Sequence, residues 1–176
     1  HVLPTLWLRN TWAWGRTGEG YPPPGRLRQT SADAIESRHA TLGVHRLVVE
    51  PGPLGPPALL FTENETNAER VFGVPNTGRY VKDAFHDYVV GGRADAVNAG
   101  SQGTKAAAHY HFTVGGGEEV VLRFRLTAVS GRPRAPFGRE FDTTFTARRA
   151  EADEFYAAHS PATASDDERR IIRQGY

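Results

Sequence analysis

Residues 119–127, EVVLRFRLT, decide the fold class, because apolar and polar side chains alternate along them. This period of two is typical of a β-strand that buries one face and exposes the other. The preceding residues 107–114, followed by the glycines 115–117, predict a hairpin partner for this strand. One face would carry Val120, Leu122, Phe124 and Leu126, and the other Arg123, Arg125 and Thr127.

Further β-rich segments lie on both sides of this hairpin. Residues 34–39 and 44–50 are expected to pair across Thr41-Leu42-Gly43, and residues 58–62 form another strand. The alternation in residues 141–147 predicts one more. Segments 15–33 and 91–105, rich in Gly, Pro, Ser and Thr, are expected to be loops.

Helical periodicity is limited to three segments. In residues 80–90 the apolar positions recur at helical spacing, which predicts a short helix docked on one side. Residues 150–158 are an acidic helix candidate. A third helix begins at Ser165, with Glu168 at the spacing of a capping box.

These segments predict a mostly β fold, an antiparallel β-sandwich with one short docked helix and C-terminal linker helices. We expect residues 1–148 to form the sandwich and residues 149–176 a helical linker. The chain begins at His1 and contains no Met, so we expect a piece of a longer protein, with a sandwich incomplete at its N-terminus. Unpaired strand edges would then favour self-association.

Composition excludes several classes of partner. The chain of 176 residues is 39% hydrophobic and 23% charged, and its 21 Lys and Arg nearly balance 20 Asp and Glu. This balance argues against nucleic acid and anionic membranes as partners. The sequence also lacks an apolar run of roughly 18 residues and the pattern of a signal peptide, which predicts a soluble, cytoplasmic protein. Zero cysteines exclude disulfides and thiol chemistry.

Two groups of residues have the composition of a metal site. His109 and His111 are two apart, so on a strand both would point to the same side. No third ligand stands at a known spacing, and we favour imidazoles that make hydrogen bonds or face solvent. Residues 63–67, ENETN, could surround a hard cation such as calcium, but a structural loop network is the more probable reading of this stretch. We therefore expect no metal and no cofactor.

Pairs of carboxylates, which glycosidases need, also occur. Glu63 with Glu65 and Asp83 with Asp87 are examples, but twenty acidic residues produce such pairs by chance. Hydrogen-bonded or solvated acids are the favoured reading. No nucleophile elbow, phosphate-binding loop, dinucleotide fingerprint or H-E-x-x-H motif is present.

Three tryptophans, Trp7, Trp12 and Trp14, lie within the first fourteen residues, with Arg9 and Asn10 between them. Indole faces with Arg and Asn donors are typical of carbohydrate sites. In an extended segment, Trp12 and Trp14 would share one side. The competing and favoured reading is a packed core in which a nearby acceptor satisfies the indole N–H.

Five blocks recur in order along the chain: LPTLWLRNTWAWG at 3–15, LFTENETN at 60–67, YVKD at 80–83, GTKAA at 103–107, and Phe141-Asp142 with EADEFY at 151–156. Together they resemble large bacterial proteins of glycoside hydrolase family 63, which includes processing α-glucosidases acting on mannosyl-oligosaccharides. The chain departs mildly from that pattern at Leu8 and Ala13, where Phe and Ser are usual.

The resemblance implies an N-terminal β-supersandwich joined to a C-terminal (α/α)6 barrel. It implies that this chain is the later part of the sandwich plus its linker, that the catalytic acid and base belong to the barrel, and that no catalytic residue lies here. The parent would be an inverting, exo-acting α-glycosidase, with this sandwich supporting the barrel and rimming its substrate opening. The barrel and an oligosaccharide would be the partners. Candidate residues for the rim or the domain interface are Arg9, Asn10, Trp12, Trp14, Glu63, Asn64, Glu65, Asn67, Lys82 and Asp83.

Two alternatives to this assignment remain open. The first is an independent carbohydrate-binding module, which would expose its tryptophans and bind oligosaccharides alone. The second is a structural spacer, in which the tryptophans would be buried and the loops would meet only protein.

Overall fold

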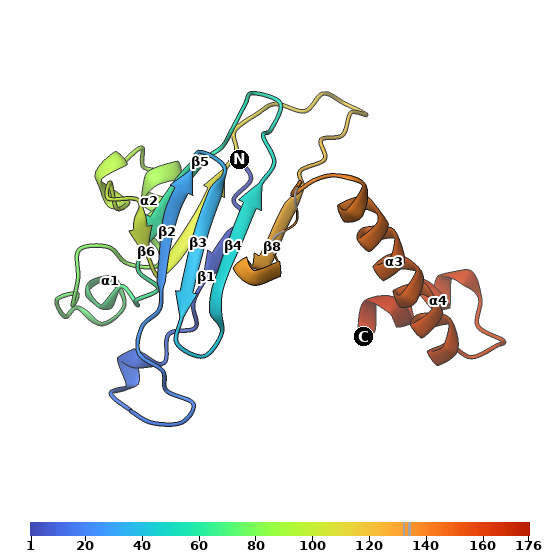
Figure 1. Cartoon of the computed structure of the whole chain (residues 1–176), viewed down its shortest axis with the longest axis horizontal. Helices are drawn as coiled ribbons and strands as arrows, with labels where there is room; N and C mark the ends of the chain where they lie inside the picture. The colour runs from blue at the N-terminus through green and yellow to red at the C-terminus, as the bar shows by residue number, and fades with distance from the viewer. Residues whose placement is uncertain (132, 134) are drawn as a thin grey trace. The chain divides into compact units, whose positions relative to one another are not determined.

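The computed structural model describes residues 1–131, 133 and 135–176 and divides into two compact units, His1–Pro133 and Arg134–Tyr176. Every β-strand among the described residues lies in the first unit, and the second is helical (Figure 1). The boundary falls before residue 148, where the sequence placed the end of the sandwich. Across the described part of the chain, no helix is both long and apolar enough to cross a membrane.

The smaller sheet has three antiparallel strands in the order β1-β7-β5. They are β1 (Thr5–Trp7), β7 (Lys105–His109) and β5 (Ala58–Thr62). The expected strand at residues 58–62 is confirmed. Successive alanines at the centre of β7 allow close packing on both faces, since Ala106 and Ala108 point to one side and Ala107 to the other.

The larger sheet has five antiparallel strands in the order β6-β2-β3-β4-β8. The pairing of residues 34–39 with the following strand is confirmed, and Gly43 at the turn has a φ of 75°, which favours glycine. The loop predicted for residues 15–33 is wrong at Arg26–Ser31, which form strand β2. Leu27 is the one apolar residue of this strand, so its sequence shows no alternation. The strands are β6 (Gln102–Gly103), β2 (Arg26–Ser31), β3 (Ala34–His39), β4 (Gly43–Val49) and β8 (Phe124–Ala128).

The two sheets bury a common core, which confirms the antiparallel sandwich. Leu27 and Ile35 of the larger sheet form one cluster with Phe61 and Ala106 of the smaller sheet. Phe61 is 1% exposed, and burial of such a side chain stabilises the fold by about 2–3 kcal/mol. A second cluster contains Val49 of β4, Ala108 of β7 and Tyr110, which follows β7.

The opposite face of the smaller sheet is covered by α2 (Ala84–Val89). Phe85 packs against Leu60 and Ala107, so the short helix is docked on one side, as expected. The helix begins at Ala84 rather than near residue 80, because the Val81 and Lys82 carbonyls accept hydrogen bonds from the Thr62 and Lys105 side chains.

The predicted hairpin between residues 107–114 and 119–127 is wrong. Strand β7 pairs with β1 and β5, whereas β8 pairs with β4 in the other sheet, so the connection crosses between sheets. Leu122 and Phe124 pack on the core as the alternation predicts, but the strand begins only at Phe124. The pairing of these two segments with strands of different sheets therefore outweighs the pairing of the two segments with each other.

Several short helices fall between the strands. The sequence did not predict α1 (Ala68–Phe72), which Asn67 caps by accepting a hydrogen bond from the Arg70 backbone. The remaining short elements are the 3₁₀ helices η1 (Trp12–Trp14), η2 (Ala94–Ala96) and η3 (Val129–Gly131).

The helical unit contains α3 (Arg139–His159) and α4 (Asp166–Gly175). The predicted strand at residues 141–147 is wrong because it lies inside α3. Phe141 stacks on Phe145, four residues further on, a spacing that a helix places on one face. Phe137, just before the helix, contacts Phe141 edge to face. The predicted helix at residues 150–158 is the second half of α3, and helix propagation from it outweighs the β-branched threonines.

The capping box of α4 is confirmed. The Ser165 side chain accepts from the Glu168 backbone, and the Glu168 carboxylate accepts from the Ser165 backbone at 2.8 Å. The backbone N–H and the hydroxyl of Ser165 both donate to the Glu168 carboxylate, and they lower the pKa of Glu168. Arg173 of α4 donates to Asp153 of α3 at 2.7 Å, which joins the two helices within this unit.

Candidate functional site

Most of the predicted site residues lie at one end of the three-stranded sheet. Trp7, the last residue of β1, and Thr62, the last residue of β5, both pair with Lys105 at the start of β7. Because β1 and β5 run antiparallel to β7 on its two sides, the segments that follow them leave the sheet together. We call this region the loop platform; it comprises residues 9–14, 63–67, 82–83 and 104–105.

Glu65 connects the two sides of the platform. Its carboxylate accepts a hydrogen bond from Asn10 Nδ2 at 3.0 Å and a short one from the indole Nε1 of Trp12. Asn10 Nδ2 also donates to the Asn64 carbonyl at 2.8 Å, and its side-chain oxygen accepts from the Ala13 backbone. The tryptophan segment is therefore anchored to the segment that follows β5.

Asn64 and Glu63 connect the same platform to β7. Asn64 Nδ2 donates to the Leu8 carbonyl at 2.9 Å, and its backbone N–H donates to Thr104 Oγ1 at 2.7 Å. The Thr104 hydroxyl in turn donates to Glu63 Oε2 at 2.7 Å. Thr104 is buried, so these bonds hold the loops where water has little access.

Asn67 and Asp83 extend the network toward α1 and α2. Asn67 Nδ2 lies 3.2 Å from both Asp83 carboxylate oxygens, and Arg70 forms an ion pair with Asp83 at 3.2 Å. Lys82 Nζ donates to Thr66 Oγ1 at 3.0 Å. Within the described part of the chain, the candidate residues other than Arg9 and Trp14 thus form hydrogen bonds to neighbouring loops.

Lys105 occupies the base of the platform on the face of the sheet that α2 covers. Its ammonium donates to the Lys82 carbonyl at 2.6 Å and lies 5.1 Å from the centre of the Phe85 ring. Burial, followed by the charge of Lys82, lowers the pKa of Lys105, while Asp83 acts in the opposite direction. This lysine therefore stabilises the loop that precedes α2.

This arrangement matches the structural reading of the ENETN stretch. Its carboxylates and amides point to partners in different loops rather than toward a common centre. Among the described residues, no group of three or more His, Asp or Glu side chains is placed to hold a metal ion. Asp83 and Asp87 likewise have separate basic partners, Arg70 and Arg93.

The three tryptophans have different environments. Trp12 is half-buried against the core and donates its indole N–H to the Glu65 carboxylate, as expected if it packs in the core. Trp14 is 57% exposed, so the expectation that the two share one side is wrong. The reason is that Trp12–Trp14 is a 3₁₀ helix, in which residues two apart point in different directions. Trp14 instead contacts the edge of Tyr21, whose hydroxyl accepts from Arg16.

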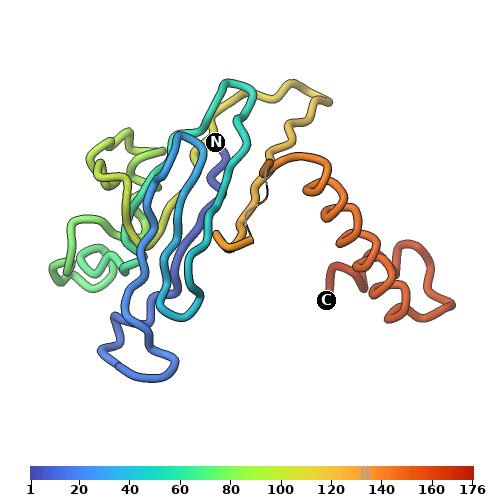
Figure 2. Tube along the Cα trace, in the orientation of Figure 1, coloured from blue at the N-terminus to red at the C-terminus, as the bar shows by residue number. Residues whose placement is uncertain are grey.

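Next to the platform lies an open cleft of about 710 Å³, mostly apolar in its lining. Trp7 contributes to its wall with an exposed fraction of 55%. In Figures 1 and 2 the N-terminal loop and the turn between β3 and β4 lie at the same end of the sandwich, and residues of both line the cleft. Its polar lining residues include Arg9, Glu19, His39 and Thr41, and its apolar ones include Trp7, Pro22, Pro23 and Leu42.

The sequence identified one side of this cleft and missed the other. Trp7 and Arg9 belong to the tryptophan cluster, but His39, Thr41 and Leu42 lie on a hairpin turn with no distinctive motif. The packing of the two sheets, which places Leu8 against Leu27 and Ile35, brings that turn to the cleft. No local pattern could have identified these residues.

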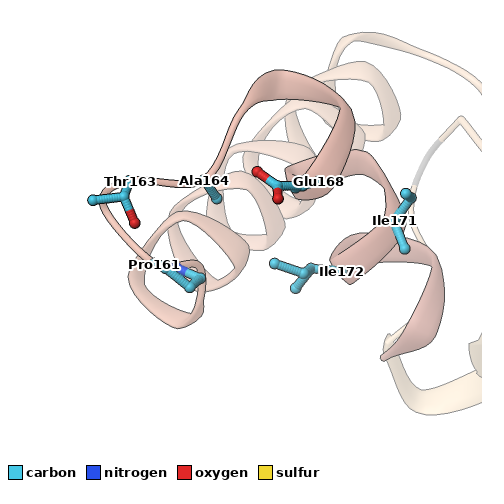
Figure 3. A pocket seen from close by; sticks show the side chains of 6 residues that line it. All are labelled: Pro161, Thr163, Ala164, Glu168, Ile171 and Ile172. Atoms are coloured by element: carbon cyan, nitrogen blue, oxygen red, sulfur yellow. The ribbon is translucent and has the colours of Figure 1, made fainter.

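The helical unit has a smaller concavity of about 310 Å³ at the start of α4 (Figure 3). Ile171 and Ile172 line it together with Pro161 and Glu168. The Glu168 carboxylate is already engaged by Ser165 in the capping box. This concavity therefore offers an apolar surface with little polar chemistry.

The histidines of the HYH motif contact the N-terminal residue. His1 Nδ1 lies 2.8 Å from His109 Nε2, and the His1 ring stacks on both His109 and His111. Burial lowers the pKa of His109, and the charges of His111 and the N-terminus lower it further. Tyr88 of α2 packs edge-on against His109.

Comparisons with known proteins give one relative. The chain is 34% identical over 205 aligned positions to the yeast protein named "Uncharacterized protein YMR196W", from Saccharomyces cerevisiae. The alignment covers all of this chain and 19% of the yeast protein, so the chain spans about a fifth of that relative's length. No protein-family model matches the chain. No solved structure matches it either.

Proposed function

We propose that this chain is the non-catalytic β-sandwich portion of a family 63-like α-glycosidase, which supports a catalytic barrel and rims its substrate opening. The observation that carries the proposal is the convergence of four sequence blocks on one platform. LPTLWLRNTWAWG, ENETN, YVKD and GTKAA are far apart in the sequence, yet hydrogen bonds join them beside one cleft. This convergence supports a common role for the four blocks in shaping the wall of the cleft.

The chemistry of the cleft supports a sugar as its ligand. A pyranose presents apolar C–H patches that pack on an indole face, and hydroxyl groups that need donors and acceptors. Trp7 offers the exposed ring, while Arg9, His39 and Thr41 offer polar groups. Trp7 lies in β1, whose backbone pairs with β7, so little backbone ordering at this wall would accompany binding.

The binding role can be tested by kinetics of the full-length enzyme on oligosaccharides. We expect Trp7→Ala to raise KM several-fold with a smaller change in kcat, because it removes contacts shared by substrate and transition state. Phe72→Ala, at an exposed aromatic outside the cleft, is the matched control. Unchanged kinetics for Trp7→Ala would count against the proposal that this cleft rims the substrate opening.

The non-catalytic role can be tested on the chain alone. Aryl α-glucosides should not be hydrolysed, because the platform carboxylates are engaged by neighbouring loops and no catalytic residue is assigned to this chain. Robust hydrolysis that a single acid substitution abolishes would overturn this part of the proposal.

A stand-alone carbohydrate-binding module is a second candidate function, favoured by the exposure of Trp7 and Trp14. Calorimetry of the chain with oligosaccharides separates the two: micromolar binding without a barrel favours the module. A structural spacer predicts tryptophans that resist acrylamide quenching.

A cytoplasmic location is also part of the proposal, and cell fractionation tests it.

A further inference from the structure

The outer face of the five-stranded sheet carries an unusual arrangement of arginines. Leu27, Ile35 and Val49 point into the core from β2, β3 and β4, so the alternate residues lie on the opposite face. Strand register places Arg28, Glu36 and Arg46 in one row across three strands. We call this surface the arginine face; it carries Arg26, Arg28, Arg38, Arg46 and Arg125, together with Glu36, Val44, Val48 and Thr127.

Charge on this face is not balanced within it. Four of its arginines, Arg26, Arg28, Arg38 and Arg46, share one glutamate, Glu36, which is paired with Arg38 at 2.6 Å. Arg26 stands directly opposite Arg38 on the neighbouring strand. Like charges in directly opposed positions destabilise a sheet, so the isolated fold gains nothing from this pairing.

Arg46 supplies an independent observation. Its Nε atom is buried and finds no hydrogen-bond partner among the residues that the structure describes. Its Nη2 atom makes only a long contact of 3.4 Å with Ser31 Oγ. A buried guanidinium donor without an acceptor costs free energy, so the described residues leave the hydrogen-bonding capacity of Arg46 partly unused.

We propose that the arginine face docks an acidic protein segment, whose Asp and Glu carboxylates pair with Arg26, Arg28, Arg38 and Arg46. The planar guanidinium fork matches a carboxylate in bidentate geometry, which an ammonium does not. Val44 and Val48 are half-buried between the charged rows, and they offer apolar contact to a polypeptide. This inference is independent of the sugar cleft and of the glycosidase assignment.

Nucleic acid fits the same face less well. The formal net charge of the whole chain is +1, so the long-range attraction that nucleic-acid binding uses is weak. The strand register places no aromatic side chain on this face for base stacking. An acidic polypeptide needs only short-range pairing with the arginine rows.

Fluorescence anisotropy of the full chain with a labelled oligoglutamate peptide tests the proposal. We expect saturable binding that weakens with added salt, since the Debye length shortens. The double variant Arg26→Gln/Arg28→Gln should weaken binding by roughly tenfold or more. Both residues are exposed, so the variant should keep the wild-type circular dichroism spectrum.

The matched control is Arg79→Gln/Arg93→Gln, which removes two exposed arginines in loops outside the five-stranded sheet. This control should bind oligoglutamate as the wild type does. Equal loss in both double variants, or no saturable binding by the wild type, would overturn the proposal. Tighter binding of an RNA oligonucleotide than of oligoglutamate at equal charge would also overturn it.

Discussion

Glu65 joins two loops that are far apart in the sequence, because its carboxylate accepts hydrogen bonds from both Asn10 and Trp12. We expect Glu65→Ala to lower the free energy of unfolding by about 1–3 kcal/mol, since both donors would lose their acceptor. The Trp12 emission should shift to the red. Glu69→Ala, at an exposed position in α1, is the control, and equal losses in the two variants would contradict this role.

Gly103 permits the close approach of β6 to the end of β5. A Cβ atom at this position would lie well inside van der Waals contact of the Thr62 backbone carbonyl. We therefore expect Gly103→Ala to cost about 1–3 kcal/mol of stability, measured by urea denaturation. Gly116→Ala is the control, because its Cβ would meet open space. A Gly103→Ala variant as stable as wild type would contradict the packing.

Tyr110 is buried and donates its hydroxyl to the Glu50 carbonyl at 2.7 Å. Burial, with a smaller contribution from the Glu50 charge, raises the pKa of Tyr110 from 10.0 to about 12. Between these values the unfolded chain loses the proton while the folded chain keeps it, so stability must fall as pH rises. Below pH 10 this contribution is fully present.

Urea denaturation between pH 9 and pH 12 measures this effect. Tyr110→Phe should be less stable at neutral pH, by about 1 kcal/mol for the lost hydrogen bond. It should also lose stability less steeply above pH 10 than the wild type. The same slope in both proteins would show that Tyr110 does not titrate as its environment requires.

At the scale of elements, Ser165 determines where α4 begins. Its side chain satisfies the Glu168 backbone N–H, and Ser165→Ala should reduce helix stability by about 1 kcal/mol. Amide hydrogen exchange would show faster exchange in the first turn of α4. Thr163→Ala, just before the helix, is the control, and unchanged protection in the Ser165 variant would contradict the cap.

Element prediction succeeded where local chemistry acts alone. The capping box and strand β5 needed only nearby residues. Residues 141–147 failed because a long helix incorporated them, and the 107–127 hairpin failed because each half found a better partner in a different sheet. Both failures follow from packing that a local pattern does not contain.

At the scale of the whole molecule, β8 is the last strand of the larger sheet among the described residues, and Leu126 on it is 50% exposed. We propose that the chain associates through such an edge. Sedimentation should show dimers at high concentration, and Leu126→Lys should shift them toward monomer, because a charge disfavours edge pairing. Val90→Lys, at an exposed position just after α2, is the control. A wild-type monomer at high concentration would contradict this proposal.

The sequence by itself determined the strand-rich class, the pairing of β3 with β4 and the α4 cap, because alternation and capping are properties of neighbouring residues. Only the tertiary structure decided that β1 and β5 flank β7, and hence that the tryptophan segment meets ENETN. The same contacts separate half-buried Trp12 from exposed Trp14. The physical reason is that long-range strand pairing follows from burying a shared core, and no short stretch of sequence carries that information.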